Sequence, residues 1–167
     1  MEYRIVKIIQ EAHNVRRFIL QAEMPFQSAF SPGQFVVLQS NLKEQGVVQR
    51  SYSISSVEPN MQTIELCISL NPAGVFTPWL FEQYVDFWIV GSEPQGSFVF
   101  QPTGNNIPYV FICTGTGVAP FRSMINEALK INGASVYLIF GNRLAEDILY
   151  HEDWKQLAQQ NENFHYH

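Results

Sequence analysis

The stretch "QRSYSISS", residues 49–56, carries side chains that suit a bound anion with an aromatic ring, in a strand where Val and Ile would pack better. Arg50 offers a fixed positive fork for a pair of phosphate oxygens. Tyr52 offers a flat face for stacking, and Ser53 a small hydroxyl that donates or accepts. Together these residue types suit the binding of an anionic, aromatic cofactor. The alternative is an ordinary strand with Tyr52 and Ile54 inward and the serines outward.

The stretch "TGTGVAP", residues 114–120, has the composition of a phosphate-binding turn. Gly115 and Gly117 follow an apolar run and open a helical pattern, where unpaired N–H groups and the helix dipole attract phosphate. Glycine also lets the backbone approach a pyrophosphate closely, and Pro120 suits a first helical turn. Pro120 replaces the third glycine of the usual dinucleotide fingerprint, and glycines that serve turn geometry alone are the alternative. The strand before and the helix after favour nucleotide binding.

A second candidate phosphate site lies in "NPAGVFTPWL", residues 71–80. Gly74 precedes a short helix that we expect to begin near Thr77, with Thr77 as its N-cap and Pro78 at the first helical position. The turn and the helix would form a small anion cradle, with the Thr77 hydroxyl as an extra donor. A plain capped helix without a ligand is the alternative.

The cysteines and the net charge exclude several classes of function. Cys67 and Cys113 lie far apart, and two thiols cannot build a four-thiolate iron–sulfur cluster or a paired zinc site. We therefore expect no metal site, and any iron–sulfur chemistry would come from a partner. A formal net charge of −5 argues against a nucleic-acid ligand.

Apolar segments of the chain are too short for a membrane span. No apolar run approaches the roughly 20 residues that cross a bilayer. Residues 1–17 begin with charged residues and a strand-like pattern, unlike a signal peptide with its apolar centre. We expect a cytoplasmic protein without a membrane span.

Residues 1–101 show short strand-like segments separated by turn signals, which is typical of a β-barrel or a β-sandwich. Pro32-Gly33 forms a turn before a strand at 35–38. Residues 63–70 alternate, with Ile64, Leu66, Ile68 and Leu70 on one face. Further strands are expected at 85–91 and 96–100.

Residues 102–167 alternate strands with helices, which predicts a parallel, doubly wound sheet. Apolar runs at 109–113 and 135–140 are typical of strands covered on both faces. Between them, an apolar stripe from Phe121 to Leu129 predicts a helix that Gly133 ends. The remaining expected segments are a linker at 101–108, a helix at 146–159 and a third strand at 163–167.

Arg50-Ser51-Tyr52-Ser53 resembles the Arg-x-Tyr-Ser flavin signature of the ferredoxin–NADP⁺ reductase superfamily. The segments "PGQF", "GVFTPWL", "GSEPQGSFVF", "GTGVAPFRSM" and "FGNRLAEDILYHEDW" resemble further motifs of this family, in the family's order and over nearly the whole chain. The combination is most similar to bacterial ferredoxin (flavodoxin)–NADP⁺ reductases, and related oxygenase reductases share much of it. The resemblance implies an FAD-binding antiparallel β-barrel with one short helix at 1–101. It implies the first part of an NAD(P)-binding α/β domain at 102–167.

The same resemblance implies the site residues. Arg50 would pair with the flavin phosphates, Tyr52 would pack on the isoalloxazine, and Ser53, the one residue expected to be catalytic, would hydrogen-bond near the hydride-accepting nitrogen. The expected flavin contacts are Arg50, Ser51, Tyr52, Ser53, Ile68, Ser69, Leu70, Gly74, Val75 and Thr77. The expected contacts to NADP or NAD are Gly115, Thr116, Gly117, Pro120, Asn142 and Arg143. Arg143 is either a ligand of a 2′-phosphate or a solvated loop arginine.

The implied activity is transfer of a hydride from NAD(P)H to FAD, and then of single electrons to a ferredoxin, a flavodoxin or an oxygenase component. The family's nucleotide domain normally continues past the point reached at His167. We therefore expect either a fragment or a sheet completed by something else, because about three parallel strands leave an exposed edge and an uncovered face. The alternative function is a non-enzymatic flavin-binding or electron-relay subunit.

Overall fold

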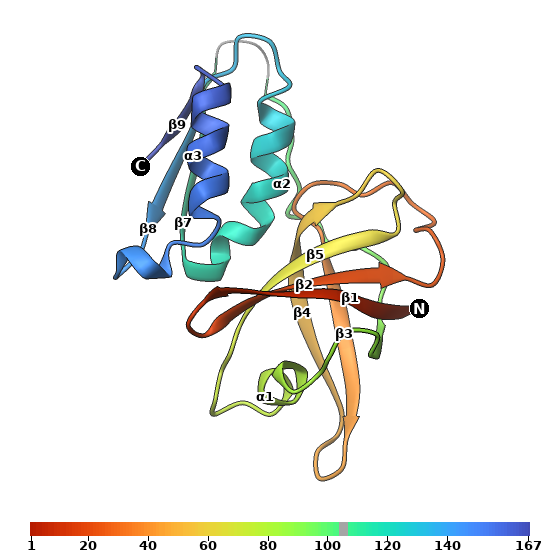
Figure 1. Ribbon diagram of the computed structural model, residues 1–167. Coiled ribbons are helices and arrows are strands. Elements are labelled where there is room, and N and C mark those ends of the chain that lie inside the picture. The colour runs from red at the N-terminus through yellow and green to blue at the C-terminus, as the bar shows by residue number, and fades with distance from the viewer. Residues whose placement is uncertain (104–106) are drawn as a thin grey trace.

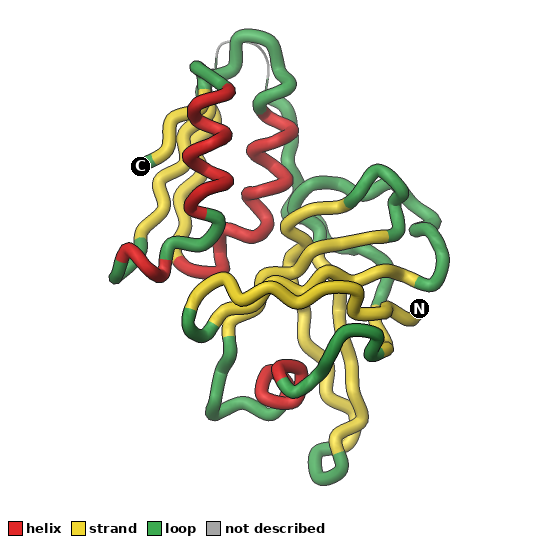
Figure 2. Tube along the Cα trace, in the orientation of Figure 1, coloured by secondary structure: helices red, strands yellow, loops and turns green. Residues whose placement is uncertain are grey.

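A β-barrel joined to an α/β module makes up the protein (Figure 1; Figure 2), as given by a computed structural model that describes residues 1–103 and 107–167. Of the expected linker, residues 104–106 lie outside the described part of the chain. Six antiparallel strands close the barrel in the order β1-β2-β5-β4-β3-β6. Their bounds are β1 Glu2–Ala12, β2 Val15–Ala22, β3 Phe35–Leu42, β4 Gly46–Val57, β5 Thr63–Ser69 and β6 Trp88–Gly91.

Alternate apolar side chains of these strands fill the barrel interior, as expected for strands with one face inward. The strand β5 is buried on both faces. Its predicted apolar face, with Ile64, Leu66 and Ile68, lies in the barrel core, whereas Glu65 and Cys67 are buried on the other face. Cys67 packs with side chains of the α/β module, so the outer face of β5 is part of the contact between the two modules.

The short helix α1 (Phe76–Phe81) packs Phe76 and Leu80 into the barrel core. The prediction that Thr77 caps this helix is wrong, because the N-cap position is Val75 and no side chain caps it. The Thr77 hydroxyl instead accepts a hydrogen bond from the backbone N–H of Asn71 at 2.9 Å and donates to the Asn71 carbonyl oxygen at 3.3 Å. It thus closes the preceding loop onto the helix.

The predicted strand at 96–100 is also wrong. This segment is joined to the barrel by a bridge between Gln95 and Phe35, and the Phe100 N–H donates to the Pro32 carbonyl oxygen at 2.9 Å. The ladder on this edge of β3 is formed by β6, at Leu38 and Gln39, and residues 96–100 do not extend it. The expected boundary between 101 and 102 falls between the end of β6 and the start of β7 and stays a prediction.

Three parallel strands in the order β7-β8-β9 form the sheet of the second module. Both helices pack on the same face of this sheet (Figure 1), and their apolar sides meet those of the strands. The bounds are β7 Tyr109–Thr114, α2 Ala119–Ala128, β8 Val136–Gly141, α3 His151–Gln160 and β9 Phe164–Tyr166.

The expectation that these strands are covered on both faces is wrong. Val110, Ile112 and Ile139 are 52%, 67% and 44% exposed, whereas Leu138 is fully buried under the helices. The cause is that α2 and α3 lie on one face, so the two-sided winding implied by the strand–helix alternation is not seen within the described residues. The expected uncovered face of a three-stranded sheet is confirmed.

Two helix boundaries differ from the sequence predictions. Helix α2 ends at Ala128, before Gly133, and the helix predicted at 146–159 is divided into a 3₁₀ turn, η2 (Ala145–Asp147), and α3. Residues 148–150 separate η2 from α3, and Tyr150, at the N-cap position of α3, has a φ of 58°, in the left-handed region that a bulky residue rarely adopts. None of the helices in the described ranges 1–103 and 107–167 is long and apolar enough to cross a membrane.

Candidate functional site

The residues predicted to bind a flavin lie where two barrel strands diverge. The pairs between β4 and β5 run from Val57 with Ile64 to Ile54 with Leu66 and stop there. Beyond Ile54, β4 continues through 50–53 paired with β3, while β5 continues through 67–69 paired with β2. The backbone edges that face this divergence form no ladder among the described strands, so their N–H and C=O groups are available to a ligand.

The side chains on this part of β4 present charge, hydroxyls and one aromatic ring. Arg50 and Ser51 are exposed, and Ser53 is half-buried. Arg50 Nη1 donates to the Gln49 carbonyl oxygen at 2.7 Å, which holds the guanidinium along the strand. The ring of Tyr52 lies 6.1 Å from that of Phe76, measured between centroids, so the tyrosine joins β4 to α1. Burial raises the pKa of Tyr52 to about 12, although Arg50 opposes this, and the phenol is therefore neutral at physiological pH.

The remaining predicted flavin residues offer mostly backbone groups. The Ile68 side chain is buried in the barrel core, so only its backbone faces outward, whereas Ser69 is exposed at the end of β5. The Leu70 N–H already donates to the Asn14 carbonyl oxygen at 2.7 Å. The loop before α1 contains half-buried Gly74 and exposed Val75. A Cβ at Gly74 would crowd Asn71 at 3.2 Å, so glycine keeps this loop compact.

The glycine-rich segment forms a 3₁₀ helix, η1 (Gly115–Val118), that runs into α2 from the end of β7. No side chain caps η1 or α2, so the first N–H groups of this helical stretch have no side-chain acceptor. Gly115 has a φ of 51°, and a Cβ there would meet no atom within 4 Å. Pro120 occupies the first turn of α2, as predicted. The start of η1, at Gly115 and Thr116, lines an open cleft and fits an anion.

An open cleft of about 960 Å³ lies at the carboxyl ends of β7 and β8, between the two modules. It brings together five residues that the sequence predicted, namely Ser69, Gly115, Thr116, Asn142 and Arg143. Gly117 and Pro120 lie just behind this lining in η1 and α2. Arg50, Tyr52, Gly74 and Thr77 are outside the cleft, on β4 and around α1. The predicted residues therefore form two groups.

Charges of both signs line the cleft. Arg143 is exposed at one end of it, and the Asn142 side-chain amide donates to the Phe140 carbonyl oxygen at 3.2 Å, which fixes the loop after β8. Glu146 and Asp147 from η2 also line the cleft, as does His13. This mixture of charges fits either nicotinamide nucleotide, so the choice between NAD and NADP stays open.

Sequence reasoning missed the opposite wall of the cleft, which is the turn between β1 and β2. Residues 12–15, with His13 and Asn14 at the tip, face the nucleotide loops across the cleft. This segment carries no motif, and its position follows from the packing of one module on the other. No local signal in the sequence could have found it.

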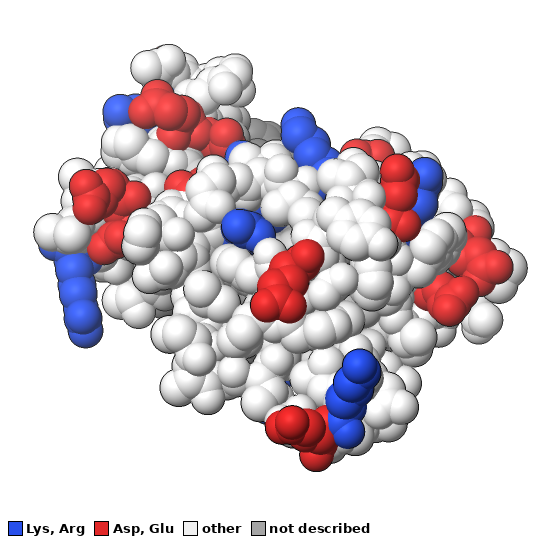
Figure 3. Space-filling view, turned by 60° about the horizontal axis from the view of Figure 1, so that its bottom comes forward, with Lys and Arg blue, Asp and Glu red and all other residues white. Residues whose placement is uncertain are grey.

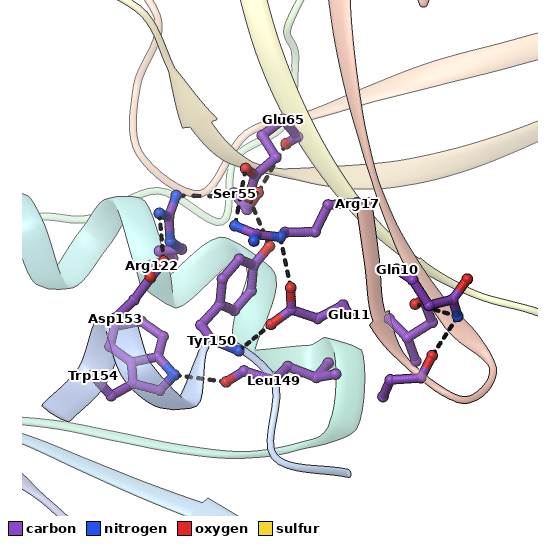
Figure 4. Close-up of polar contacts among 12 residues, drawn as sticks. Gln10, Glu11, Arg17, Ser55, Glu65, Arg122, Leu149, Tyr150, Asp153 and Trp154 are labelled. Carbon is purple, nitrogen blue, oxygen red and sulfur yellow. Dashed lines mark hydrogen bonds and ion pairs between the residues drawn. The ribbon is translucent and has the colours of Figure 1, made fainter. Parts of the chain in front are cut away.

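Sequence reasoning also missed a polar cluster between the modules, buried at its centre and exposed at Asp153 (Figure 4). We call it the interdomain cluster. It contains Glu11, Arg17, Ser55, Glu65, Arg122, Tyr150 and Asp153. One signal was available, because Glu65 shares its strand face with Cys67, an apolar residue that indicates burial of that face.

The face of the molecule drawn in Figure 3 is neither uniformly positive nor uniformly negative. Lysine and arginine side chains are interspersed there with aspartate and glutamate, and broad uncharged areas lie between them. Such a surface differs from the continuous basic stripe of nucleic-acid-binding proteins.

Comparisons with known proteins match both modules. Residues 2–100 match the model of the oxidoreductase FAD-binding domain, and 111–167 match the oxidoreductase NAD-binding domain. The glycine betaine monooxygenase reductase subunit of Pseudomonas aeruginosa is 32% identical over 98% of this chain and 45% of its own length. Ferredoxin–NADP reductase B of Sorangium cellulosum is 32% identical over 82% of this chain and 56% of its own length.

A solved structure agrees with these matches. The crystal structure of a cytochrome P450 reductase of Amycolatopsis is 26% identical and has a TM-score of 0.87 over 99% of this chain and 50% of that chain. The chain spans about half the length of the curated relatives it matches.

Proposed function

Because the chain belongs to the FAD-binding oxidoreductases of the ferredoxin–NADP⁺ reductase superfamily, we propose that it is an NAD(P)H-dependent flavoprotein reductase. Two sites would serve this function, one for FAD on the barrel and one for the nicotinamide nucleotide in the cleft. The observation that carries the proposal is their adjacency. The divergence of β4 and β5 ends at Ser69, which also lines the cleft with Gly115 and Thr116.

The barrel residues fit FAD by their chemistry and exposure. Arg50 and Ser51 project from β4 as exposed donors for phosphate, and Tyr52 provides a neutral aromatic surface. Gly74 and Val75 leave the loop before α1 open for a pyrophosphate, while the Thr77 hydroxyl stabilises that loop through Asn71. Ser53 donates or accepts a single hydrogen bond beside the ring.

The α/β residues fit the nicotinamide nucleotide. The uncapped N–H groups at the start of η1 supply the donors for its phosphates, and Gly115 allows a close approach because no Cβ intervenes. Asn142 and Arg143 hold the adenosine half at the other end of the cleft. In this proposal the nicotinamide lies near Ser69, at the edge of the flavin site.

The chemistry that bound FAD supplies is acceptance of a hydride from NAD(P)H and release of single electrons. No general base is required, so no acid–base residue is assigned. The chain's own task is to hold the two nucleotides in contact and to exclude water between them. The acceptor is a ferredoxin or an oxygenase component, in line with the names of the relatives, or a flavodoxin, as the resemblance of the motifs implies.

The location of the protein in the cell stays a prediction. We propose the cytoplasm, because both cysteines are free thiols, which fits a reducing compartment.

An absorption spectrum of the purified protein, followed by anaerobic titration with NADH and NADPH, tests the proposed function. A yellow protein that is bleached by one of these nucleotides supports a reductase. A yellow protein that responds to neither supports the non-enzymatic flavin-binding or electron-relay subunit instead. A colourless protein that takes up no added FAD overturns both.

A further inference from the structure

The two walls of the cleft are tied together by the interdomain cluster (Figure 4). One wall is the β1–β2 turn, residues 12–15, and the other is the loop that follows β8 and ends at Leu149. Glu11 directly precedes the first wall, and Tyr150 directly follows the second. The Glu11 carboxylate accepts a hydrogen bond from the backbone N–H of Tyr150, so a single contact joins the two walls at their bases.

The base of the first wall is held by an ion pair within the barrel. Arg17 Nε lies 2.6 Å from Glu11 Oε2, and these residues stand on the two sides of the β1–β2 turn. The Arg17 N–H is not aimed along this axis, so the contact is an ion pair without hydrogen-bond geometry. It nevertheless orients the carboxylate toward Tyr150.

Glu65 anchors the base of the second wall to the barrel. Its Oε1 accepts hydrogen bonds at 2.9 Å from the Ser55 hydroxyl and from the Tyr150 hydroxyl. Arg17 and Arg122 each lie 3.6 Å from one of its carboxylate oxygens. Burial raises the pKa of Tyr150 well above its ordinary value, so its hydroxyl remains a donor to Glu65.

The backbone of Tyr150 adopts a conformation that its sequence does not favour. Its φ of 58° is costly for a residue with a Cβ, and such conformations persist where surrounding contacts fix them. The contacts here are the hydrogen bonds to Glu11 and Glu65 and the guanidinium groups of Arg17 and Arg122, which lie 5.2 and 4.8 Å from the ring centroid. The strain is therefore located at the junction between the cleft loop and α3.

We propose that the interdomain cluster is a clasp that holds the two walls of the cleft at a fixed separation, with Glu11 and Tyr150 as positioning residues for the nicotinamide nucleotide. This inference rests on the proposed function for the identity of the ligand, although the clasp itself rests on the geometry alone. Buried ion pairs add little net stability, and in this proposal their role is to fix one arrangement of the groups they join. The clasp removes, before binding, the freedom of the walls that the nucleotide would otherwise have to order.

Amide hydrogen exchange of the full chain tests the clasp without any nucleotide. The variants are Glu11→Ala, which removes the acceptor, Glu11→Gln, which keeps one oxygen acceptor, and Tyr150→Phe, which removes only the hydroxyl. In Glu11→Ala and Tyr150→Phe, exchange in 12–15 and 142–149 is expected to rise by about tenfold, because opening of the cleft walls becomes easier. Glu11→Gln is expected to change it by less than about threefold. The matched control Arg4→Ala breaks an exposed ion pair with Asp86 on the barrel and leaves both segments unchanged.

Equilibrium titration with NAD⁺ and NADP⁺ on the FAD-loaded protein tests the positioning role. Dissociation constants in Glu11→Ala and Tyr150→Phe are expected to rise about tenfold, with FAD affinity and the flavin spectrum unchanged. Ile5→Val, which lowers stability inside the barrel core, serves as the structural control and leaves the nucleotide affinity unchanged.

The two experiments separate failure of the clasp from failure of the proposed function. Unchanged exchange in folded Glu11→Ala and Tyr150→Phe overturns the clasp, whatever the chain binds. Faster exchange with unchanged nucleotide affinity overturns the positioning role. A wild-type protein that binds neither nucleotide overturns the proposed function, and the exchange measurement still decides the clasp. If Glu11→Ala does not fold, Tyr150→Phe decides, because it removes one oxygen only.

Discussion

Ser53 is the first residue of β4 beyond the point where its pairing with β5 stops. Its neighbour Ile54 is fully buried and still pairs with Leu66, whereas Ser53 pairs with Phe35 of β3 and faces the divergence on its other side. On that side the backbone of Ser53 pairs with no strand of the described residues, and its side chain is half-buried. The hydroxyl is therefore placed for a ligand, and its contribution can be measured apart from folding.

Replacing Ser53 with alanine is expected to slow hydride transfer from NAD(P)H by about tenfold or more, because one hydrogen bond at the reacting ring is lost. FAD affinity is expected to fall less, since phosphate and ring contacts remain. Stopped-flow flavin bleaching under anaerobic conditions measures the rate, and Ser56→Ala, farther along β4, is the control. Unchanged rates in Ser53→Ala would remove the catalytic assignment.

The reactivity of the two cysteine thiols gives a second prediction at the scale of single residues. Burial raises the pKa of Cys67 and Cys113 from 9.0 to about 12, so at pH 8 the native thiolate population is about a thousandfold lower than in the unfolded chain. A disulfide reagent is expected to label native protein at least about a hundredfold more slowly than protein in urea. Rapid labelling of the native protein would contradict the burial of Cys67 and the half-burial of Cys113.

The same thiols set the sign of an alkaline effect on stability. The pKa of each thiol is higher in the folded state, so folding favours the protonated thiol. The contribution of this protonated form to the free energy of unfolding is fully present below pH 9 and is lost as the pH rises from 9 to 12. Urea unfolding at pH 8 and pH 10 measures the difference, and stability is expected to be lower at pH 10.

At the scale of elements, the strands of the parallel sheet have one covered and one open face, and β8 shows the contrast in adjacent residues. Leu138 is fully buried under the helices, and Ile139 is 44% exposed on the opposite face. Leu138→Ala is expected to lower the free energy of unfolding by about 2–5 kcal/mol. Ile139→Thr is expected to change it by about 0.5 kcal/mol or less. Urea unfolding followed by circular dichroism measures both, and similar losses would mean that the open face is covered in solution.

The turn before β3 gives a second matched pair. Gly33 has a φ of 107°, and a Cβ there would collide with the Phe98 carbonyl oxygen and the Met124 side chain. Gly46 has a φ of 68° with open space around it. Both alanine substitutions incur backbone strain of about 1–2 kcal/mol, and Gly33→Ala adds the collision. Thermal unfolding is expected to show the larger loss for Gly33→Ala, and equal losses would contradict the close approach of these segments.

Local signals predicted most of the elements, and the errors arose where distant contacts decide. The Phe121–Leu129 stripe gave α2, and the alternation at 63–70 gave β5. Residues 96–100 have a strand-like composition but form no ladder, and only the preceding Gln95 bridges to β3, at Phe35. The left-handed Tyr150, which divides the predicted helix at 146–159, depends on contacts to the barrel.

In the candidate site, too, some residues were predictable from local sequence and others were not. Residues 50–53 and 114–120 carry chemistry in their own types and spacing, and the structure places both at openings. The turn at 12–15 and Glu65 acquire their places only when the modules pack together, which no local pattern encodes.

At the scale of the whole molecule, the two modules depend on each other unequally. The barrel core is made of residues from the barrel alone, from Tyr3 to Ile89. The core of the α/β module includes Cys67 of the barrel, and Ala12 and Val15 pack against it. One face of its sheet is open, and the segment 102–167 falls in the size range where a single core is marginal.

Separate expression of 1–101 and 102–167 tests this asymmetry and the expected domain boundary. The first fragment is expected to unfold cooperatively, because its core is complete, and to lose some stability through exposure of Glu65 and Cys67. The second is expected to show no cooperative transition, because the barrel side chains that complete its core are missing. Circular dichroism and urea titration of each fragment, with the full chain as reference, measure this. A cooperatively folded 102–167 fragment would show that the α/β module needs no support from the barrel.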